Sequence, residues 1–247
     1  MNPIKIFITT WHRTDMLERC LREIKERTST PHELIVFDNG SDADEVKYIK
    51  DLHTSHKCDS IILWPHNTGP YFPKAVFYSL TTPEDVYFVS NDADTYPPKV
   101  NPDWLARMTT EMDLYPDIGV MTPQLPPQHM MGPKYERGNH VVCTAVGNQL
   151  SVVRRSAWPT LTWPQESWKF GDDSLRSQRM EANGFLTAYM RDTWCMHDGQ
   201  CEKWGYTDAQ LAEDPRKATY DDPYYYIYEI ETYKPVDPDL QDWRRQK

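Results

Sequence analysis

The sequence predicts an α/β fold in which a mainly parallel central sheet is flanked by helices. Short apolar runs of strand length alternate with longer amphipathic segments through the first half of the 247 residues. One run, residues 85–94, is rich in β-branched and aromatic side chains and ends in two aspartates, Asp92 and Asp94. The length suits one large domain, and 39% hydrophobic with 13% aromatic residues is enough for a sizeable core.

The first strand and helix are clear in the residue pattern. Residues 4–9 form a continuous apolar run, which is typical of a parallel strand covered on both faces. Residues 15–27 follow as a helix, and Asp15 with Glu18 can cap its start. Its apolar positions recur on one helical face: Met16, Leu17, Cys20, Leu21 and Ile24.

The alternation continues to residue 121. Further strands are predicted at residues 33–37, 61–63, 86–90 and 118–121. The helices between them are predicted at residues 44–57, 73–80 and 102–114. This order predicts a Rossmann-like sheet, because strands separated by helices pair in parallel.

After residue 122 the alternation breaks. Several prolines make the chain irregular through Asn139: Pro123, Pro126, Pro127 and Pro133. A strand at 149–154, a helix at 172–183 and a strand at 185–190 follow. Residues 213–247 are rich in Asp, Pro and Tyr, and the run 224–228 is compatible with a strand, an interface or a flap.

Charge and cysteines limit the classes of function. The net charge of −10 gives no general attraction to nucleic acid or to an anionic membrane. Five scattered cysteines argue against a disulfide framework and for a reducing compartment. Cys195-x-His197-x₃-Cys201 could contribute to a zinc site, but its spacing matches no strong pattern. No secretory leader or membrane-length apolar run is visible, so we expect a soluble, cytoplasmic protein.

Asp92 and Asp94 are the leading candidates for metal chemistry. In an extended backbone, residues two apart project to the same face, so both carboxylates can act on one cation. Strand ends are also where open α/β sheets bind ligands. Such oxygens suit Mg²⁺ or Mn²⁺, the ions that accompany diphosphates. The alternative is that Asp-Ala-Asp merely ends a strand in a solvated turn.

A series of motifs in fixed order extends over about residues 4–200. They are Thr9-Thr10-Trp11-His12-Arg13, Val36-Phe37-Asp38-Asn39-Gly40-Ser41, Asn67-Thr68-Gly69-Pro70 with Lys74, Asp92-Ala93-Asp94, Gly171-Asp172-Asp173-Ser174-Leu175-Arg176 and His197-Asp198-Gly199. This series resembles the nucleotide-sugar glycosyltransferases of the GT-A fold, and most closely the inverting family 2. Trp11-His12 stands where that family usually has Tyr-Asn, beside the expected nucleotide base.

The resemblance implies a nucleotide-sugar donor, here a UDP sugar, and a Mn²⁺ or Mg²⁺ ion. Asp94 of the DXD motif would coordinate the metal directly. Asp92 would hold the ribose and reach the metal through water, and His197 would be a further ligand. The other residues implied to contact the donor are Thr9, Arg13, Asp38, Asn67, Gly69 and Lys74.

Each donor residue also has a plainer interpretation. Asp38 can form an ordinary Asx turn with the following Asn-Gly. Arg13 can pair with Asp15 on the surface, and Asn-x-Gly at residues 67–69 is common in turns. Lys74 can be a solvated lysine on a helix, and His197 can be structural.

The acceptor side is implied by the motif at residues 171–176. Asp173 aligns with the general base that deprotonates the acceptor hydroxyl, and Asp172, where the family usually has Glu, would contact the acceptor or the scaffold. The plainer interpretation is an acidic first turn favoured by the helix dipole. Trp163, Trp168 and Phe170 are candidates for an acceptor platform or, alternatively, for core packing.

Together these features predict a metal-dependent inverting glycosyltransferase that uses a hydroxyl acceptor. The resembling domain would cover residues 1–212, with a donor half to about 122, an acceptor half beyond it, and an extension at 213–247. The alternatives are a nucleotidyltransferase acting on sugar phosphates, whose usual glycine-rich loop is missing after residue 9, and an inactive nucleotide-sugar-binding protein. Saccharide, protein, lipid-linked and modified-nucleobase acceptors all stay open, although the acidic composition gives a nucleic-acid acceptor no support.

Overall fold

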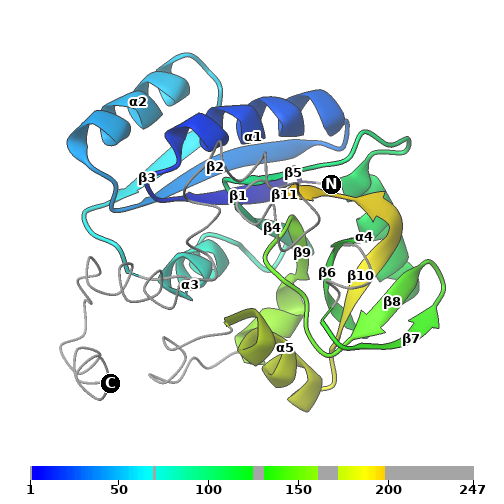
Figure 1. Cartoon of the computed structure of the whole chain (residues 1–247). Helices are drawn as coiled ribbons and strands as arrows, with labels where there is room; N and C mark the ends of the chain where they lie inside the picture. Colours follow the sequence, from blue (N-terminus) through cyan, green and yellow to red (C-terminus); the bar gives the residue numbers. More distant parts are fainter. Residues whose placement is uncertain (1, 69–70, 125–130, 161–171, 198–247) are drawn as a thin grey trace, which may run out of the picture.

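A computed structural model describes residues 2–68, 71–124, 131–160 and 172–197, where the strands form a nine-stranded sheet and a separate two-stranded one (Figure 1). The strand order is β3-β2-β1-β4-β9-β6-β10-β8-β7. The strands are β1 Ile4–Thr10, β2 His32–Asn39, β3 Ser60–Trp64, β4 Tyr87–Asp92, β6 Ile118–Gln124, β7 Pro133–Arg137, β8 His140–Cys143, β9 Ser151–Arg154 and β10 Leu186–Trp194. Among them, β8 and β9 run against the others, so the sheet is mixed but mostly parallel.

Helices cover both faces of this sheet, as Figure 1 shows for α1 and α2 on one side and α3 and α5 on the other. They are α1 Thr14–Arg27, α2 Ala43–Thr54, α3 Tyr71–Ser79, α4 Trp104–Leu114 and α5 Asp172–Ala182, with a 3₁₀ helix at Arg155–Thr160. Alternate strand residues face opposite layers. Ile6 and Ile8 of β1 join the core under α1, α2 and α4, whereas Phe7 stacks on Phe77 of α3 with ring centroids 4.5 Å apart.

The predicted alternation up to residue 121 is confirmed, with small shifts at the element ends. The later strand, helix and strand are confirmed as β9, α5 and β10. α1 begins after Arg13, one residue earlier than expected, and the Arg13 side chain makes no capping hydrogen bond. Asp15 lies in the first turn of the helix, where an acidic residue was expected. Asp42 does cap α2, accepting the backbone N–H groups of Asp44 and Glu45.

The expectation of an irregular chain through Asn139 is partly wrong. β6 runs through Pro123 to Gln124, and β7 pairs with β8 in an antiparallel hairpin. β7 is an exposed edge strand and β8 has only four residues, so neither leaves a clear alternating pattern. Gly138 turns the hairpin at a φ of 58°, where a Cβ atom would lie 2.5 Å from Glu111 Oε1.

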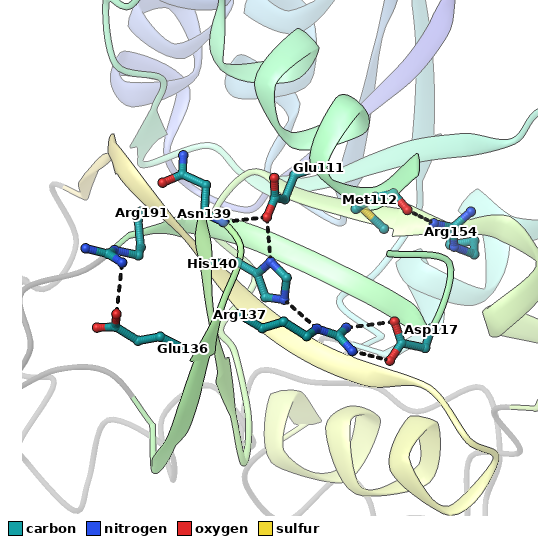
Figure 2. Close-up of polar contacts among 9 residues, drawn as sticks. All are labelled: Glu111, Met112, Asp117, Glu136, Arg137, Asn139, His140, Arg154 and Arg191. Atoms are coloured by element: carbon teal, nitrogen blue, oxygen red, sulfur yellow. Dashed lines mark hydrogen bonds and ion pairs between the residues drawn. The ribbon is translucent and has the colours of Figure 1, made fainter. Parts of the chain in front are cut away.

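A buried histidine joins this hairpin to α4 (Figure 2). Nδ1 of His140 lies 2.8 Å from Glu111 Oε1, which also accepts the Asn139 N–H at 2.7 Å. Arg137 donates from Nε to His140 Nε2 at 3.4 Å and makes two hydrogen bonds, at 2.7 and 2.8 Å, to Asp117. Because Nε2 is an acceptor, the contacts fit a neutral ring that carries its proton on Nδ1.

We expect the free energy of unfolding to decrease as the pH falls through about 6.5, the ordinary pKa of histidine. Burial lowers the pKa of His140 in the folded protein, although the Glu111 carboxylate opposes this effect. Below the unfolded pKa the unfolded chain therefore binds the proton more readily, and stability is lost. Urea unfolding of wild type and His140→Gln between pH 5 and 7.5 measures this contribution. A pH dependence as steep in the variant as in wild type would contradict it.

Candidate active site

The expected donor residues meet where the parallel strands end. β1 lies between β2 and β4, and its register places Thr9 beside Asp92 and Thr10 beside Asp38. The backbone N–H of Ala93 donates to Thr9 O at 3.0 Å. The carboxyl ends of these strands therefore gather the polar residues at one sheet edge, the usual ligand position in an open α/β sheet.

Asp92 ends β4 and is partly buried, and the turn that follows at Ala93 and Asp94 is buried. Asp94 is 2% exposed, and Arg13 Nη1 donates to its Oδ2 at 2.6 Å. The pKa of Asp92 is raised to about 6, chiefly by burial and next by the charge of Asp94, while Lys74 and a hydrogen bond from Asn148 oppose the rise. The motif does end a strand in a turn, but the turn is not solvated as the plainer interpretation expected, because Ala93 and Asp94 are buried.

Lys74 on α3 interacts with a carboxylate from each half of the chain, Asp92 and Asp173. It is 3% exposed, so the interpretation as a solvated helix lysine is wrong. Its Nζ lies 3.5 Å from Asp173 Oδ1 on α5, and its charge also lowers the pKa of Asp92 on β4. A buried ammonium group is costly unless it faces carboxylates. These residues therefore form one charged cluster.

The position of Asp173 fits both an acidic residue in the first turn of a helix and a carboxylate on the acceptor side of the site. α5 begins at Asp172, so Asp173 lies in the first helical turn, where the helix dipole favours a carboxylate. The same side chain faces Lys74 and lies 3.5 Å from Arg176 Nη2. Its negative charge also raises the pKa of Asp92. The helix thus places this carboxylate opposite the end of β4.

Asn39 and Gly40 hold the loop that follows β3. Asn39 donates from Nδ2 to Asn67 Oδ1 at 3.1 Å, and its Oδ1 accepts the Thr68 N–H at 3.0 Å and the Thr68 hydroxyl at 2.7 Å. Gly40 has a φ of 88°, and a Cβ atom there would lie 2.2 Å from the carbonyl carbon of His66. Sequence reasoning treated Asn39 as a turn residue only, because nothing local indicates a contact with residues so far along the chain.

Asp38 is fully buried at the end of β2. Both of its carboxylate oxygens accept the Ser41 N–H at 3.3 Å, so the Asx-type turn contact is present. Burial raises the pKa of this carboxyl, and the contacts with Ser41 oppose that rise. The turn contact is long for a hydrogen bond. The role of Asp38 toward the nucleotide stays a prediction.

Near the end of its described part, the chain pairs with the strand that follows the Asp92-Ala93-Asp94 motif. β11, Met196–His197, pairs antiparallel with β5, Thr95–Tyr96, and His197 lies opposite Thr95. The His197 backbone is therefore one residue along the ladder from Asp94. For Asp172 and His197 the described structure covers the backbone alone. Other expected residues lie outside the described ranges altogether: Gly69, Trp163, Trp168, Phe170, Cys201 and the run 224–228.

The cysteines give the zinc hypothesis no support. Burial raises the pKa of the Cys195 thiol to about 12, and Cys201 lies outside the described residues. Among the described residues, the cysteines are free thiols: Cys20, Cys58, Cys143 and Cys195.

A further group of possible ligands lies just after β1. Ligand atoms of His12, Asp42 and Glu45 come within 4.8 Å of one another, and His12 Nδ1 lies 2.5 Å from Glu45 Oε2. His12 has a φ of 52°, and sequence reasoning did not foresee this contact. His12 and Asp42 are exposed, and exposed ion pairs of this kind contribute little to stability.

The mixed, mostly parallel α/β sheet with acidic residues at its strand ends is the arrangement of the GT-A fold. The chain belongs to glycosyl transferase family 2, whose family model matches residues 5–192. A comparison of the sequence with curated proteins gives no match. Within the described ranges, no helix has the length and apolarity needed to cross a membrane.

Solved structures show the same fold at low sequence identity. One is the mannosyltransferase PcManGT from Pyrobaculum calidifontis in complex with GDP-Man and Mn²⁺, at 16% identity and a TM-score of 0.64, covering 99% of this chain and 70% of that one. GalNAc-T7 with UDP, GalNAc and Mn²⁺ is 13% identical with a TM-score of 0.61, covering 100% of this chain and 54% of that one. TarS 1–349 from S. aureus with UDP-GlcNAc is 12% identical with a TM-score of 0.56, covering 99% and 71%.

Proposed function

We propose that this protein is a metal-dependent, inverting glycosyltransferase that moves a sugar from a UDP donor to a hydroxyl acceptor. The observation that carries the proposal is the charged cluster of Asp92, Lys74 and Asp173 beside Asp94. It combines a donor-side pair of carboxylates at a strand end with a separate carboxylate on the first turn of α5. Inverting transfer needs both, because one side must hold the leaving diphosphate while the other takes a proton.

The carboxylates fit a divalent cation. The negative charge of Asp94 raises the pKa of Asp92, and a cation between hard oxygen donors would relieve this repulsion. Asp94 and Asp92 would hold the ion, with His197 as a further ligand. When bound, Mn²⁺ or Mg²⁺ supplies a positive charge that offsets the charge developing on the leaving diphosphate. Mn²⁺ accompanies the nucleotide in the PcManGT and GalNAc-T7 structures.

The chain's own residues would then divide the work between donor and acceptor. Thr9, Asp38 and Asn67 line the strand ends where the nucleotide would bind, and Arg13 adds positive charge near the diphosphate. Asp173 would take the proton from the acceptor hydroxyl as the new bond forms. Lys74 faces both sides and balances the negative charge of Asp92 and Asp173. Attack from the side of Asp173 would invert the anomeric centre.

The same proposal assigns residues 1–122 to the donor half and about 123–212 to the acceptor half. The placement of Asp92 on β4 and Asp173 on α5 is in line with this division. The extension at 213–247 is proposed as a separate part of the chain.

Incubation with individual UDP sugars and Mn²⁺ tests the function. A transferase is expected to release UDP slowly, because water can replace the missing acceptor. Chelation of the metal should stop this release. Formation of UTP that depends on pyrophosphate would instead indicate a nucleotidyltransferase. Binding without either reaction would indicate an inactive nucleotide-sugar-binding protein.

Asp38→Ala is expected to weaken UDP binding by about 1–3 kcal/mol, the range for losing a hydrogen bond to a charged group. Isothermal titration calorimetry in Mn²⁺ measures the change. Asp103→Ala is the control, because Asp103 caps α4 and contacts Ser29 and Thr30, so its loss should lower stability without changing UDP affinity. Unchanged affinity in Asp38→Ala would remove Asp38 from the nucleotide site.

A further inference from the structure

The loop between the strands β8 and β9, both labelled in Figure 1, makes hydrogen bonds to β4 on the proposed donor side and to α5 on the proposed acceptor side. At its end, the Leu150 N–H donates to Asn91 Oδ1 on β4 at 2.8 Å. Earlier in the loop, the Val146 N–H donates to Ser177 Oγ on α5 at 3.3 Å. Residues 144–150 therefore connect the strand that carries Asp92 with the helix that carries Asp173.

Asn148 lies at the centre of this connection. Its side chain is buried, with 5% of the residue exposed. Its Nδ2 donates to Asp92 Oδ1 at 2.9 Å, and its Oδ1 accepts from Arg176 Nη1 at 3.4 Å. A primary amide suits both neighbours, because it offers donors to the anion and an acceptor to the cation without adding a charge. This pairing also determines which way the amide is oriented.

Arg176 holds the Asn148 amide by donating a hydrogen bond to its oxygen. The residue is fully buried, and its Nη2 donates to Val146 O at 2.8 Å and Gly147 O at 3.1 Å. The same nitrogen lies 3.5 Å from Asp173 Oδ1. One guanidinium group thus contacts the loop backbone, Asn148 and the acceptor-side carboxylate.

We propose that Asn148 is a positioning residue for the transfer reaction. Its amide fixes Oδ1 of Asp92 and leaves the second carboxylate oxygen for the donor. Through Arg176, the same amide also ties the position of Asp92 to that of Asp173. This role rests on the proposed function, in which Asp92 acts on the donor and Asp173 on the acceptor.

Asn148→Leu tests the role, because leucine keeps the side-chain size and removes both polar groups. The matched control is Gln149→Leu: Gln149 is a buried amide in the same loop, and no described hydrogen bond joins it to Asp92 or Asp173. Asn148→Leu is expected to lower the urea midpoint, because Asp92 and Arg176 each lose a buried partner. Gln149→Leu should lower it less, because the buried Oε1 that it removes has no hydrogen-bond partner among the described residues. Calorimetry in Mn²⁺ is expected to show UDP affinity about tenfold weaker in Asn148→Leu and unchanged in Gln149→Leu. Asn148→Ser replaces the leucine variant if the latter does not fold.

An equal loss of UDP affinity in both variants, or no loss in either, would overturn the positioning role. A second readout does not depend on any ligand: the side-chain NH₂ signals of Asn148 in a ¹⁵N NMR spectrum should shift when Asp92 is changed to asparagine. Absence of that shift would show that the contact is not formed and would also overturn the inference. If the shift is seen, but the wild-type protein neither binds UDP nor releases UDP from any UDP sugar, the result would instead contradict the proposed function.

Discussion

Replacing Asp173 by asparagine is expected to lower kcat by roughly two to four orders of magnitude, the usual contribution of a positioned general base. Asparagine preserves the size of the side chain and most of its hydrogen bonding but cannot accept the proton. Donor affinity should hardly change, because Asp38, Asp92 and Asp94 hold the donor in the proposed site. Steady-state kinetics with the active UDP sugar, together with calorimetry of UDP binding, separates the two effects.

Glu181→Gln is the matched control for Asp173→Asn. Glu181 lies on the same helix, but it is exposed and pairs with Lys134, so its loss should leave kcat unchanged. The product from wild type should have the anomeric configuration opposite to that of the donor, which proton NMR determines. Retention of configuration would point to a different mechanism on the same fold. Loss of donor affinity in step with rate would make Asp173 part of the donor site or a purely structural residue.

Asp94→Ala is expected to abolish transfer and the Mn²⁺-dependent part of UDP binding, because it removes the proposed direct ligand of the metal. The structure adds a second consequence: Asp94 is buried and paired with Arg13, so the variant also loses an ion pair. Asp85→Ala controls for that loss. Asp85 lies before the start of β4, is buried, and pairs with Lys5 at 2.7 Å.

Both variants should be less stable in urea unfolding, but only Asp94→Ala should lose Mn²⁺-dependent UDP binding. The comparison therefore separates the chemical role of the carboxylate from its contribution to folding. Full activity of wild type after removal of metal by a chelator, or unchanged binding in Asp94→Ala, would refute the metal role.

Much of the fold could be predicted because its first half is locally encoded. A segment that packs on the core needs apolar residues at regular positions. This requirement gives β1 its continuous apolar run and α1 its helical periodicity. Such patterns survive in the sequence without knowledge of the partner strand. The hairpin of β7 and β8 could not be found in this way, because an exposed edge strand needs no apolar alternation and its docking depends on His140 meeting Glu111.

The site shows the same division. Asp92, Asp94 and Asp173 were predicted as site residues from the order of short motifs, and the structure places Lys74 between Asp173 and the end of β4. Their roles toward a metal or an acceptor stay predictions. Asn39, Asn148 and Arg176 were missed, because their side chains act through hydrogen bonds to residues distant in sequence. An isolated asparagine in a loop gives no local signal of such a contact.

By itself, the sequence determined the α/β class, the order of the strands and helices through residue 121, and membership of a glycosyltransferase family. These properties depend on local periodicity and on motifs, which are read along the chain. Tertiary structure alone decided that Lys74 is buried between carboxylates, that Asp94 pairs with Arg13, and that one loop connects β4 to α5. The physical reason is that burial and electrostatic coupling depend on which distant segments pack together, and packing assembles these groups only when the whole sheet has formed.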